Sequence, residues 1–335
     1  MIPFSPPPSR RPVCGVLALV LLLSAGCQTP PRPGPTADRL VADGIARAEQ
    51  QDYDGAIADF NRALALRPGD ADTRFNLGLA RGSKQDYAGA LAEFNRALAL
   101  RPGDPEIWLS RGSVKFYQED YAGAIADYDR AVAVRPDYAL GYYARALAQR
   151  RRGNYDGAFA DYDRAIALDP SSWLAYNGRA TTRNGHGDFA LALPDYARRI
   201  ALRPEDAQYV WFERSLVLRR LGRPDEFDLA GEVAGWPDGW PKTVGRFLLG
   251  DLEAGVLLRL AAAPADAQTR REQLCEANYY VGMDALLDGR TAEAREKFLA
   301  CRATGVDVFL EYFLAGVELA RLGDGDRVGQ VPKDR

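Results

Sequence analysis

The sequence predicts an all-α fold: a right-handed superhelical solenoid of helix hairpins, closed by a C-terminal capping helix. The phrase "DYDGAIADFNRALALRP" begins at residue 52 and returns, with changes, at residues 86, 120, 154 and 188, a period of 34 residues. Each 34-residue unit contains two stretches with helical periodicity. One hairpin cannot bury its apolar face alone, whereas stacked hairpins bury a continuous core.

Composition supports a folded array. The chain has 335 residues, of which 47% are hydrophobic, and its formal net charge is -3. This composition supplies a packed core and argues against disorder. A charge so close to neutral gives no indication of nucleic acid as a partner.

The first 26 residues are interpreted as a secretory signal. Arg10 and Arg11 precede an apolar run at residues 13–23, and small residues lead to Cys27. The run is shorter than the roughly 20 apolar residues that span a bilayer. The alternatives are an uncleaved anchor or a wrongly assigned start codon.

The stretch "LSAGC", which ends at Cys27, resembles the lipobox of bacterial lipoproteins. The resemblance implies cleavage before Cys27 and attachment of diacylglycerol to its thiol. Gln28 stands where the inner-membrane retention signal usually has Asp, which implies the outer membrane. "SRR" at residues 9–11 is similar to a twin-arginine signal, but the residues after it fit poorly, so ordinary secretion is favoured. Residues 27–36 then form a proline-rich tether.

Five repeats fill residues 37–206. In each second helix an Asp or Asn precedes the apolar pattern and is expected to cap the helix: Asp52, Asp86, Asp120, Asn154 and Asp188. A proline ends the same helix: Pro68, Pro102, Pro136, Pro170 and Pro204. Small residues recur at the eighth and twentieth positions, and an aromatic residue recurs at the twenty-fourth. The small residues allow two antiparallel helices to approach closely, and the aromatic residue fills the space between hairpins.

This pattern resembles the tetratricopeptide repeat in period, small-residue spacing, aromatic position and terminal proline. The resemblance implies a superhelix whose concave side is lined by the first helix of each repeat.

The pattern weakens after residue 206. Residues 207–242 are predicted to hold a degenerate helix and an irregular junction rich in Pro and Gly. Residues 243–322 are predicted to form a C-terminal repeat-like helical region with a capping helix. Within it, Gly282, Ala294 and Phe298 fall at the eighth, twentieth and twenty-fourth positions of a hairpin. Residues 323–335 are expected to be a frayed tail.

The C-terminal part is similar to the NlpI family of outer-membrane lipoproteins. The similarity rests on "GWPKTVGRFLLGDL", "CEANYYVGMDALLDG" and "FLEYFLAGVELARLG", which follow a lipobox and a repeat array in the same order. It implies a homodimeric adaptor that faces the periplasm. It further implies that the adaptor brings peptidoglycan endopeptidases together with a processing protease.

Few residues suit catalysis. The only histidine, His186, lies in the turn "NGHGD", and a surface role is favoured over a catalytic one. No metal site, phosphate loop or cofactor is predicted, and the chain is not expected to be an enzyme. Recurrent carboxylates precede an arginine by three residues and are predicted to form exposed ion pairs: Asp59, Glu93, Asp127, Asp161 and Asp195.

Cys275 and Cys301 occupy positions one and twenty-seven of the same C-terminal hairpin. These positions face each other on antiparallel helices. In an oxidising compartment they would form a disulfide worth roughly 2–4 kcal/mol. Two buried free thiols are the equally weighted alternative.

Without catalytic chemistry, function is expected on the concave surface. Positions two, five, nine, twelve and thirteen of the repeat are predicted to point inward, and about a third of these side chains are expected to be core. The resulting groove residues are Phe75, Leu79, Leu109, Phe116, Tyr117, Tyr143, Leu147, Arg150, Arg151, Asn177 and Trp211. Tyr, Trp and Arg are favoured anchors of protein interfaces.

The sequence therefore favours a lipid-anchored adaptor in the bacterial cell envelope, at the outer membrane and facing the periplasm, that binds protein partners. The resemblance to the NlpI family names a peptidoglycan endopeptidase and a periplasmic protease as those partners. A scaffold for outer-membrane assembly or polysaccharide export is one alternative. A dimeric structural spacer is another.

Overall fold

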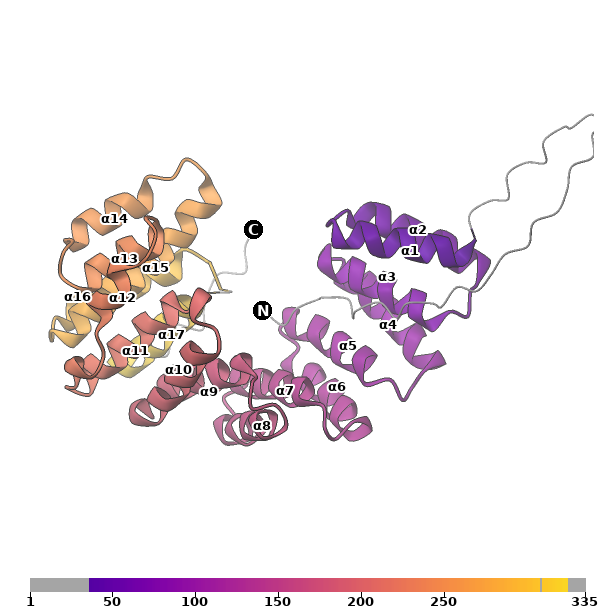
Figure 1. Ribbon diagram of the computed structural model, residues 1–335, viewed down its shortest axis with the longest axis horizontal. Coiled ribbons are helices and arrows are strands. Elements are labelled where there is room, and N and C mark those ends of the chain that lie inside the picture. The colour runs from indigo at the N-terminus through magenta and orange to yellow at the C-terminus, as the bar shows by residue number, and fades with distance from the viewer. Residues whose placement is uncertain (1–35, 308, 325–335) are drawn as a thin grey trace, which may run out of the picture. The chain divides into compact units, whose positions relative to one another are not determined.

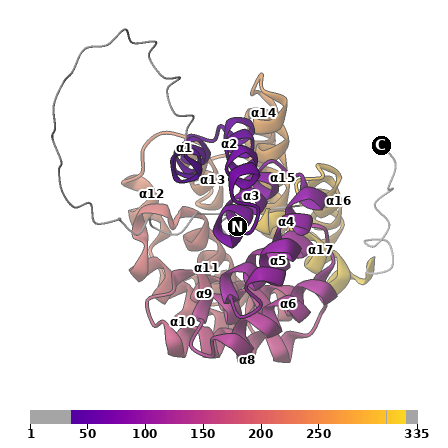
Figure 2. The same cartoon turned by 90° about the vertical axis from the view of Figure 1, so that its right-hand side faces the viewer.

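The computed structural model describes residues 36–307 and 309–324, and every regular element in these residues is helical (Figure 1; Figure 2). The chain divides into two compact units, residues 1–170 and 171–335. The predicted all-α array of helix hairpins is confirmed. The lipobox cysteine Cys27, the predicted signal and most of the tether lie outside the described residues, as does the tail after residue 324.

Unit 1 holds four hairpins in succession, coloured from indigo to magenta in Figure 1. The first helices are α1 (Ala37–Glu49), α3 (Ala71–Ser83), α5 (Pro105–Tyr117) and α7 (Ala139–Arg151). The second helices are α2 (Tyr53–Leu66), α4 (Tyr87–Leu100), α6 (Tyr121–Val134) and α8 (Tyr155–Leu168).

Side-chain caps start the second helices of unit 1. The side chains of Asp52, Asp86, Asp120 and Asn154 each accept a hydrogen bond from the backbone N–H three residues later, at 2.9–3.2 Å. Each such cap contributes about 1 kcal/mol to helix stability. Asp188 makes no such bond, so the cap predicted there is wrong.

Each hairpin of unit 1 buries its recurrent aromatic residue. Phe60, Phe94, Tyr128 and Tyr162 are at most 1% exposed. A Cβ atom added at Gly78 would lie 2.6 Å from the Phe94 ring. In the first three hairpins, glycine at the eighth position therefore lets the two helices approach this closely, whereas the fourth has Ala146 there.

The recurrent carboxylates agree with the prediction only in part. Asp59 pairs with Arg62 of its own helix at 3.0 Å, as predicted, but its side chain is buried. Asp127 and Asp161 are 3% exposed, so they are not surface groups. Arg111 and Arg145, on the first helices, each direct two N–H groups at the carboxylate 16 residues later, at 2.6–2.9 Å. At these two positions the first-helix arginine therefore supplies the bidentate partner of a buried carboxylate.

Unit 2 begins with the fifth hairpin, α9 (Trp173–His186) and α10 (Phe189–Leu202). Four α-helices follow: α11 (Gln208–Arg220), α12 (Leu229–Ala234), α13 (Trp240–Leu248) and α14 (Ala254–Ala262). The last helices are α15 (Ala267–Leu287), α16 (Thr291–Ala303) and α17 (Leu310–Leu319), which is followed by η3 (Ala320–Asp324).

The hairpin of α15 and α16 repeats the packing of unit 1. A Cβ atom added at Gly282 would lie 2.7 Å from the Phe298 ring, much as at Gly78. The chain after α17 then returns to α9, where Arg321 donates hydrogen bonds to the carbonyl oxygens of Asn184 and Gly185 at 2.9 and 3.1 Å. The first and last elements of unit 2 are thus tied together.

Candidate functional site

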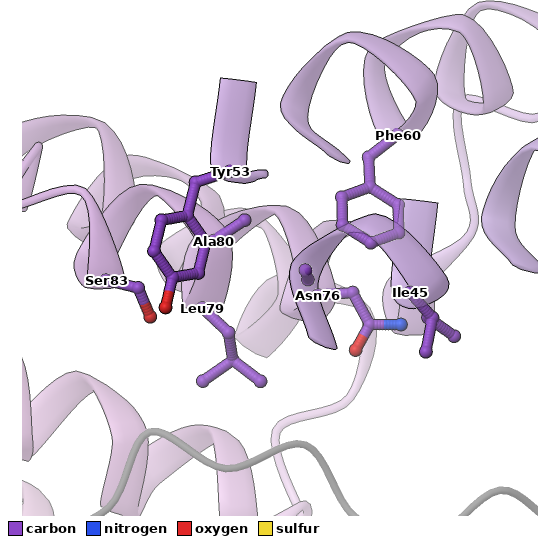
Figure 3. Close-up of a pocket in the computed structure, with 8 residues that line it drawn as sticks. Ile45, Tyr53, Phe60, Asn76, Leu79, Ala80 and Ser83 are labelled. Carbon is purple, nitrogen blue, oxygen red and sulfur yellow. The ribbon is translucent and has the colours of Figure 1, made fainter. Parts of the chain in front are cut away.

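A pocket opens in unit 1 between α1, α2 and α3, and we refer to it as the α1–α3 pocket (Figure 3). Its volume is about 410 Å³, counting space that is open to solvent. The eight lining residues are Ile45, Ala48, Tyr53, Phe60, Asn76, Leu79, Ala80 and Ser83.

Three helices supply the pocket wall. Phe60 and Ala80 belong to the hydrophobic core of the first hairpins, and Ile45 packs partly buried against them. Figure 3 shows Tyr53, Leu79 and Ser83 toward one end of the pocket and Ile45 toward the other. The wall is therefore anchored in the core while its aromatic and aliphatic surface remains partly exposed.

Polar groups at the pocket are few. The Asn76 amide and the Ser83 hydroxyl make no side-chain hydrogen bond within the part of the chain that the structure describes. Next to Ser83, Lys84 forms an ion pair with Asp54 across the hairpins. An apolar ligand group can thus enter while the two polar side chains remain able to bind its polar atoms.

A group of half-buried aromatic side chains lies one repeat further along. The Tyr87 and Tyr117 rings are parallel, with centroids 6.4 Å apart and an interplanar angle of 4°. Phe116 meets the edge of Tyr117 at 6.1 Å and of Tyr121 at 5.3 Å. These side chains come from α4, α5 and α6 of unit 1.

The predicted groove residues divide by burial. Leu109, Tyr143 and Trp211 are 7–8% exposed and belong to the core. The other eight are partly exposed: Phe75, Leu79, Phe116, Tyr117, Leu147, Arg150, Arg151 and Asn177. Asn177 and Trp211 lie in unit 2, and the remaining nine lie in unit 1.

Only Leu79 from that set lines the α1–α3 pocket. Sequence reasoning missed Ile45, Ala48 and Ser83, although they occupy the ninth, twelfth and thirteenth positions of their repeats. Applying the same positional rule to small and aliphatic residues would have found them. Tyr53 opens a second helix, so a rule confined to first helices could not identify it.

The C-terminal hairpin brings its two cysteines together. The sulfur atoms of Cys275 and Cys301 lie 3.4 Å apart, and both side chains are fully buried. They are free thiols in this structure, since a disulfide bond measures about 2.05 Å. The disulfide stays a prediction.

His186 is exposed, and its Nδ1 atom lies 2.8 Å from Asp188. No cluster of three or more His, Cys, Asp or Glu side chains suited to a metal ion occurs within residues 36–307 and 309–324. No helix in the same ranges is long and apolar enough to cross a bilayer.

Unit 2 contains buried carboxyl groups with hydrogen-bond donors, among them Glu213 and Glu276. Glu213 accepts hydrogen bonds from Asn184 at 3.0 Å and Tyr279 at 3.3 Å, and burial raises its pKa to about 8. Glu276 accepts from Tyr209 at 2.8 Å and Trp240 at 2.7 Å, and burial raises its pKa to about 8 as well. Their neutral donors and closed surroundings mark these groups as parts of the core.

Comparison with known proteins agrees with the repeat geometry. Residues 41–105 and 109–172 match the family model described as tetratricopeptide repeat. These segments are tetratricopeptide repeats. The tetratricopeptide repeat is an interaction module, so the family match indicates a protein–protein interaction scaffold. No curated protein matches the chain.

One solved structure supports the tetratricopeptide fold, and two others are similar over about half of this chain. A tetratricopeptide repeat protein from Parabacteroides merdae is 17% identical with a TM-score of 0.54, and the match covers 85% of this chain and 99% of that one. MamA from Desulfovibrio magneticus is 20% identical with a TM-score of 0.47, covering 52% and 98%. YrrB, described as having an unusual peptide-binding site, is 18% identical with a TM-score of 0.43, covering 53% and 92%.

Proposed function

We propose that the protein is an adaptor that binds segments of partner proteins on the first-helix face of unit 1. The observation that carries the proposal is the α1–α3 pocket, an apolar cavity with two unused polar side chains within an interaction repeat. The partly exposed aromatic side chains Phe116 and Tyr117 extend the same kind of surface. Aromatic anchors of this type dominate the energetics of protein interfaces.

The adaptor is further proposed to act in the cell envelope. The support is the lipobox-like "LSAGC", which would place a diacylglycerol on Cys27 and hold the protein at the outer membrane. Replacing the thiol tests this directly. Cys27→Ser is expected to move the protein from the membrane fraction to the soluble envelope fraction, and an unchanged distribution would refute the anchor.

The similarity to the NlpI family suggests the class of partner. A peptidoglycan endopeptidase and a processing protease would then be brought together by one scaffold, which would itself be a homodimer. Protein without Cys27 should capture enzymes of these classes from a periplasmic extract. Capture of assembly or export proteins would replace this assignment with the scaffold alternative. If the protein is a dimer and captures no specific partner, the dimeric structural spacer becomes the favoured function.

Lysine substitutions on two different faces separate the pocket face from the rest of unit 1. Leu79→Lys/Phe116→Lys places two charges on the partly exposed first-helix face and is expected to abolish capture. Leu66→Lys/Leu100→Lys makes the same change on second helices of the first two repeats, at side chains 57% and 46% exposed, and should leave capture intact. Equal capture by both variants would refute binding at this face.

A further inference from the structure

The first three repeats can be compared at two positions: the first residue of a second helix and the last residue of the first helix that follows it. Tyr53 and Tyr87 are 34 residues apart and both begin a second helix. Ser83 and Tyr117 are also 34 residues apart and both end a first helix. The pair Tyr53 and Ser83 therefore corresponds to the pair Tyr87 and Tyr117.

In the pair Tyr87 and Tyr117, the second residue supplies an aromatic ring beside the first. In the pair Tyr53 and Ser83, the second residue has no ring. The Tyr117 ring lies parallel to the Tyr87 ring, with centroids 6.4 Å apart. Ser83 has no ring to place on Tyr53, and both residues line the α1–α3 pocket (Figure 3). The pocket is thus the unfilled counterpart of a tyrosine side chain that the next repeat supplies.

We propose that the α1–α3 pocket is a subsite for one aromatic side chain of a partner protein. The ring would lie over Tyr53 as the Tyr117 ring lies over Tyr87. Offset parallel rings attract each other beyond the effect of area burial, so an aromatic side chain is favoured over an aliphatic one of similar size. This assignment rests on the proposed function, since it names what the partner segment carries.

The surrounding groups agree with an uncharged aromatic ligand. Lys84 and Asp54 already pair with each other beside the pocket, so neither offers an uncompensated charge to a ligand. The Ser83 hydroxyl and the Asn76 amide can accept from a phenol or indole, or bind the backbone of the partner segment. Ile45, Leu79 and Phe60 supply apolar parts of the wall.

The first test uses small probes that need no identified partner. N-acetyl-tyrosinamide, N-acetyl-phenylalaninamide and N-acetyl-leucinamide are titrated into the protein while NMR signals are followed. The aromatic amides are expected to shift the signals of Tyr53, Leu79 and Ser83 at concentrations at least tenfold below the leucine amide. Equal effects of leucine and the aromatic amides would overturn the proposal.

Two substitutions change the pocket without removing a core residue. Ser83→Tyr supplies the missing ring and is expected to weaken binding of the aromatic amides at least tenfold while the melting temperature is retained. Tyr53→Leu keeps an apolar wall but removes the ring face, so the preference for aromatic over leucine amide should disappear. Retention of aromatic binding in Ser83→Tyr, or of the preference in Tyr53→Leu, would overturn the proposal.

The reverse substitution is the matched control. Tyr117→Ser removes the internal ring from Tyr87 and should open a second pocket one repeat further along. Titration with N-acetyl-tyrosinamide should then shift Tyr87 in addition to Tyr53. Absence of any effect at Tyr87 would contradict the equivalence of the two pairs on which the assignment rests.

A displayed peptide library separates this proposal from the broader function. Selected peptides that share one aromatic position and fail to bind the Ser83→Tyr variant would support both the aromatic subsite and the adaptor function. Selected peptides without that preference, or with undiminished binding to Ser83→Tyr, would overturn the subsite and leave the adaptor function standing. If no peptide is selected, the adaptor function fails and the amide titration alone decides the subsite.

Discussion

Arg145 donates hydrogen bonds from Nε and Nη2 to the two carboxylate oxygens of Asp161, each at 2.7 Å. Asp161 is only 3% exposed, and Arg145 also reaches Asp129 of the preceding hairpin at 2.6 Å. One guanidinium therefore holds its own hairpin together and links it to the previous one. This relationship recurs at Arg111, which joins Asp127 and Asn95.

Removing the Asp161 carboxylate should destabilise unit 1 strongly. Asp161→Ala leaves Arg145 without its bidentate partner, and breaking a buried pair costs about 3–5 kcal/mol. Urea unfolding followed by circular dichroism measures the loss. Asp156→Ala, on the same helix but exposed, is the control and should change the free energy of unfolding by less than about 0.5 kcal/mol. Similar losses in both variants would contradict the structural role of the pair.

The close approach at Gly78 predicts a second stability effect. Gly78→Ala places a Cβ atom 2.6 Å from the Phe94 ring, and overpacking of this kind costs about 1–3 kcal/mol. Gly103→Ala is the control, because a Cβ atom there meets nothing within 4 Å. Thermal unfolding compares the two. Phe94→Leu in the Gly78→Ala background should cost less than in the wild type, since the smaller side chain relieves the clash.

The buried carboxyls predict a pH dependence in unit 2. Glu213 ionises near pH 4.5 in the unfolded chain but stays protonated in the folded one until about pH 8. The unfolded state loses its proton first, so the free energy of unfolding should fall as pH rises through this window. The slope is about 1.4 kcal/mol per pH unit for each such carboxyl.

Unfolding at pH 5 and pH 8 tests that sign. Tryptophan fluorescence is a suitable signal because four of the five tryptophans lie in unit 2. Glu213→Gln should reduce the slope, whereas the exposed Glu232→Gln should leave it unchanged. Greater stability at pH 8 than at pH 5, with Glu213→Gln unchanged, would refute the assignment.

The adjacent thiols predict a redox-dependent crosslink. Cys275 and Cys301 are close enough for side-chain movement to bring their sulfur atoms into bonding distance in an oxidising compartment. Peptide mapping without reduction is then expected to find the two cysteine peptides joined. Recovery of both thiols in alkylated form from the cell envelope would favour the free-thiol alternative.

Local features of the fold could be predicted because they depend on one repeat at a time. The caps at Asp52 and Asp86, the glycine at position eight and the buried aromatic residue all follow from short-range pattern and helix geometry. The same positions identified the α15–α16 hairpin through Gly282 and Phe298, despite its distance from the other repeats.

Features that depend on packing between elements could not be predicted in the same way. Asp161 has an arginine three residues later, which suggested an exposed pair, but its principal partner is on the other helix of the hairpin. Tyr143 and Trp211 were assigned to the groove, yet neighbouring helices bury them. The α1–α3 pocket depends on the small side chain of Ser83. A search for large anchor residues in the sequence overlooks such a position.

Site-directed photo-crosslinking in intact cells tests the central claim most directly. A photoreactive residue at Lys84 stands on the exposed rim next to Ser83, whereas one at Leu100 stands on an exposed second-helix position of the same repeat. Binding at the α1–α3 pocket predicts a protein adduct from position 84 that is absent from position 100 and is lost on adding Ser83→Tyr. Adducts from position 100 alone, or equally from both, would contradict it.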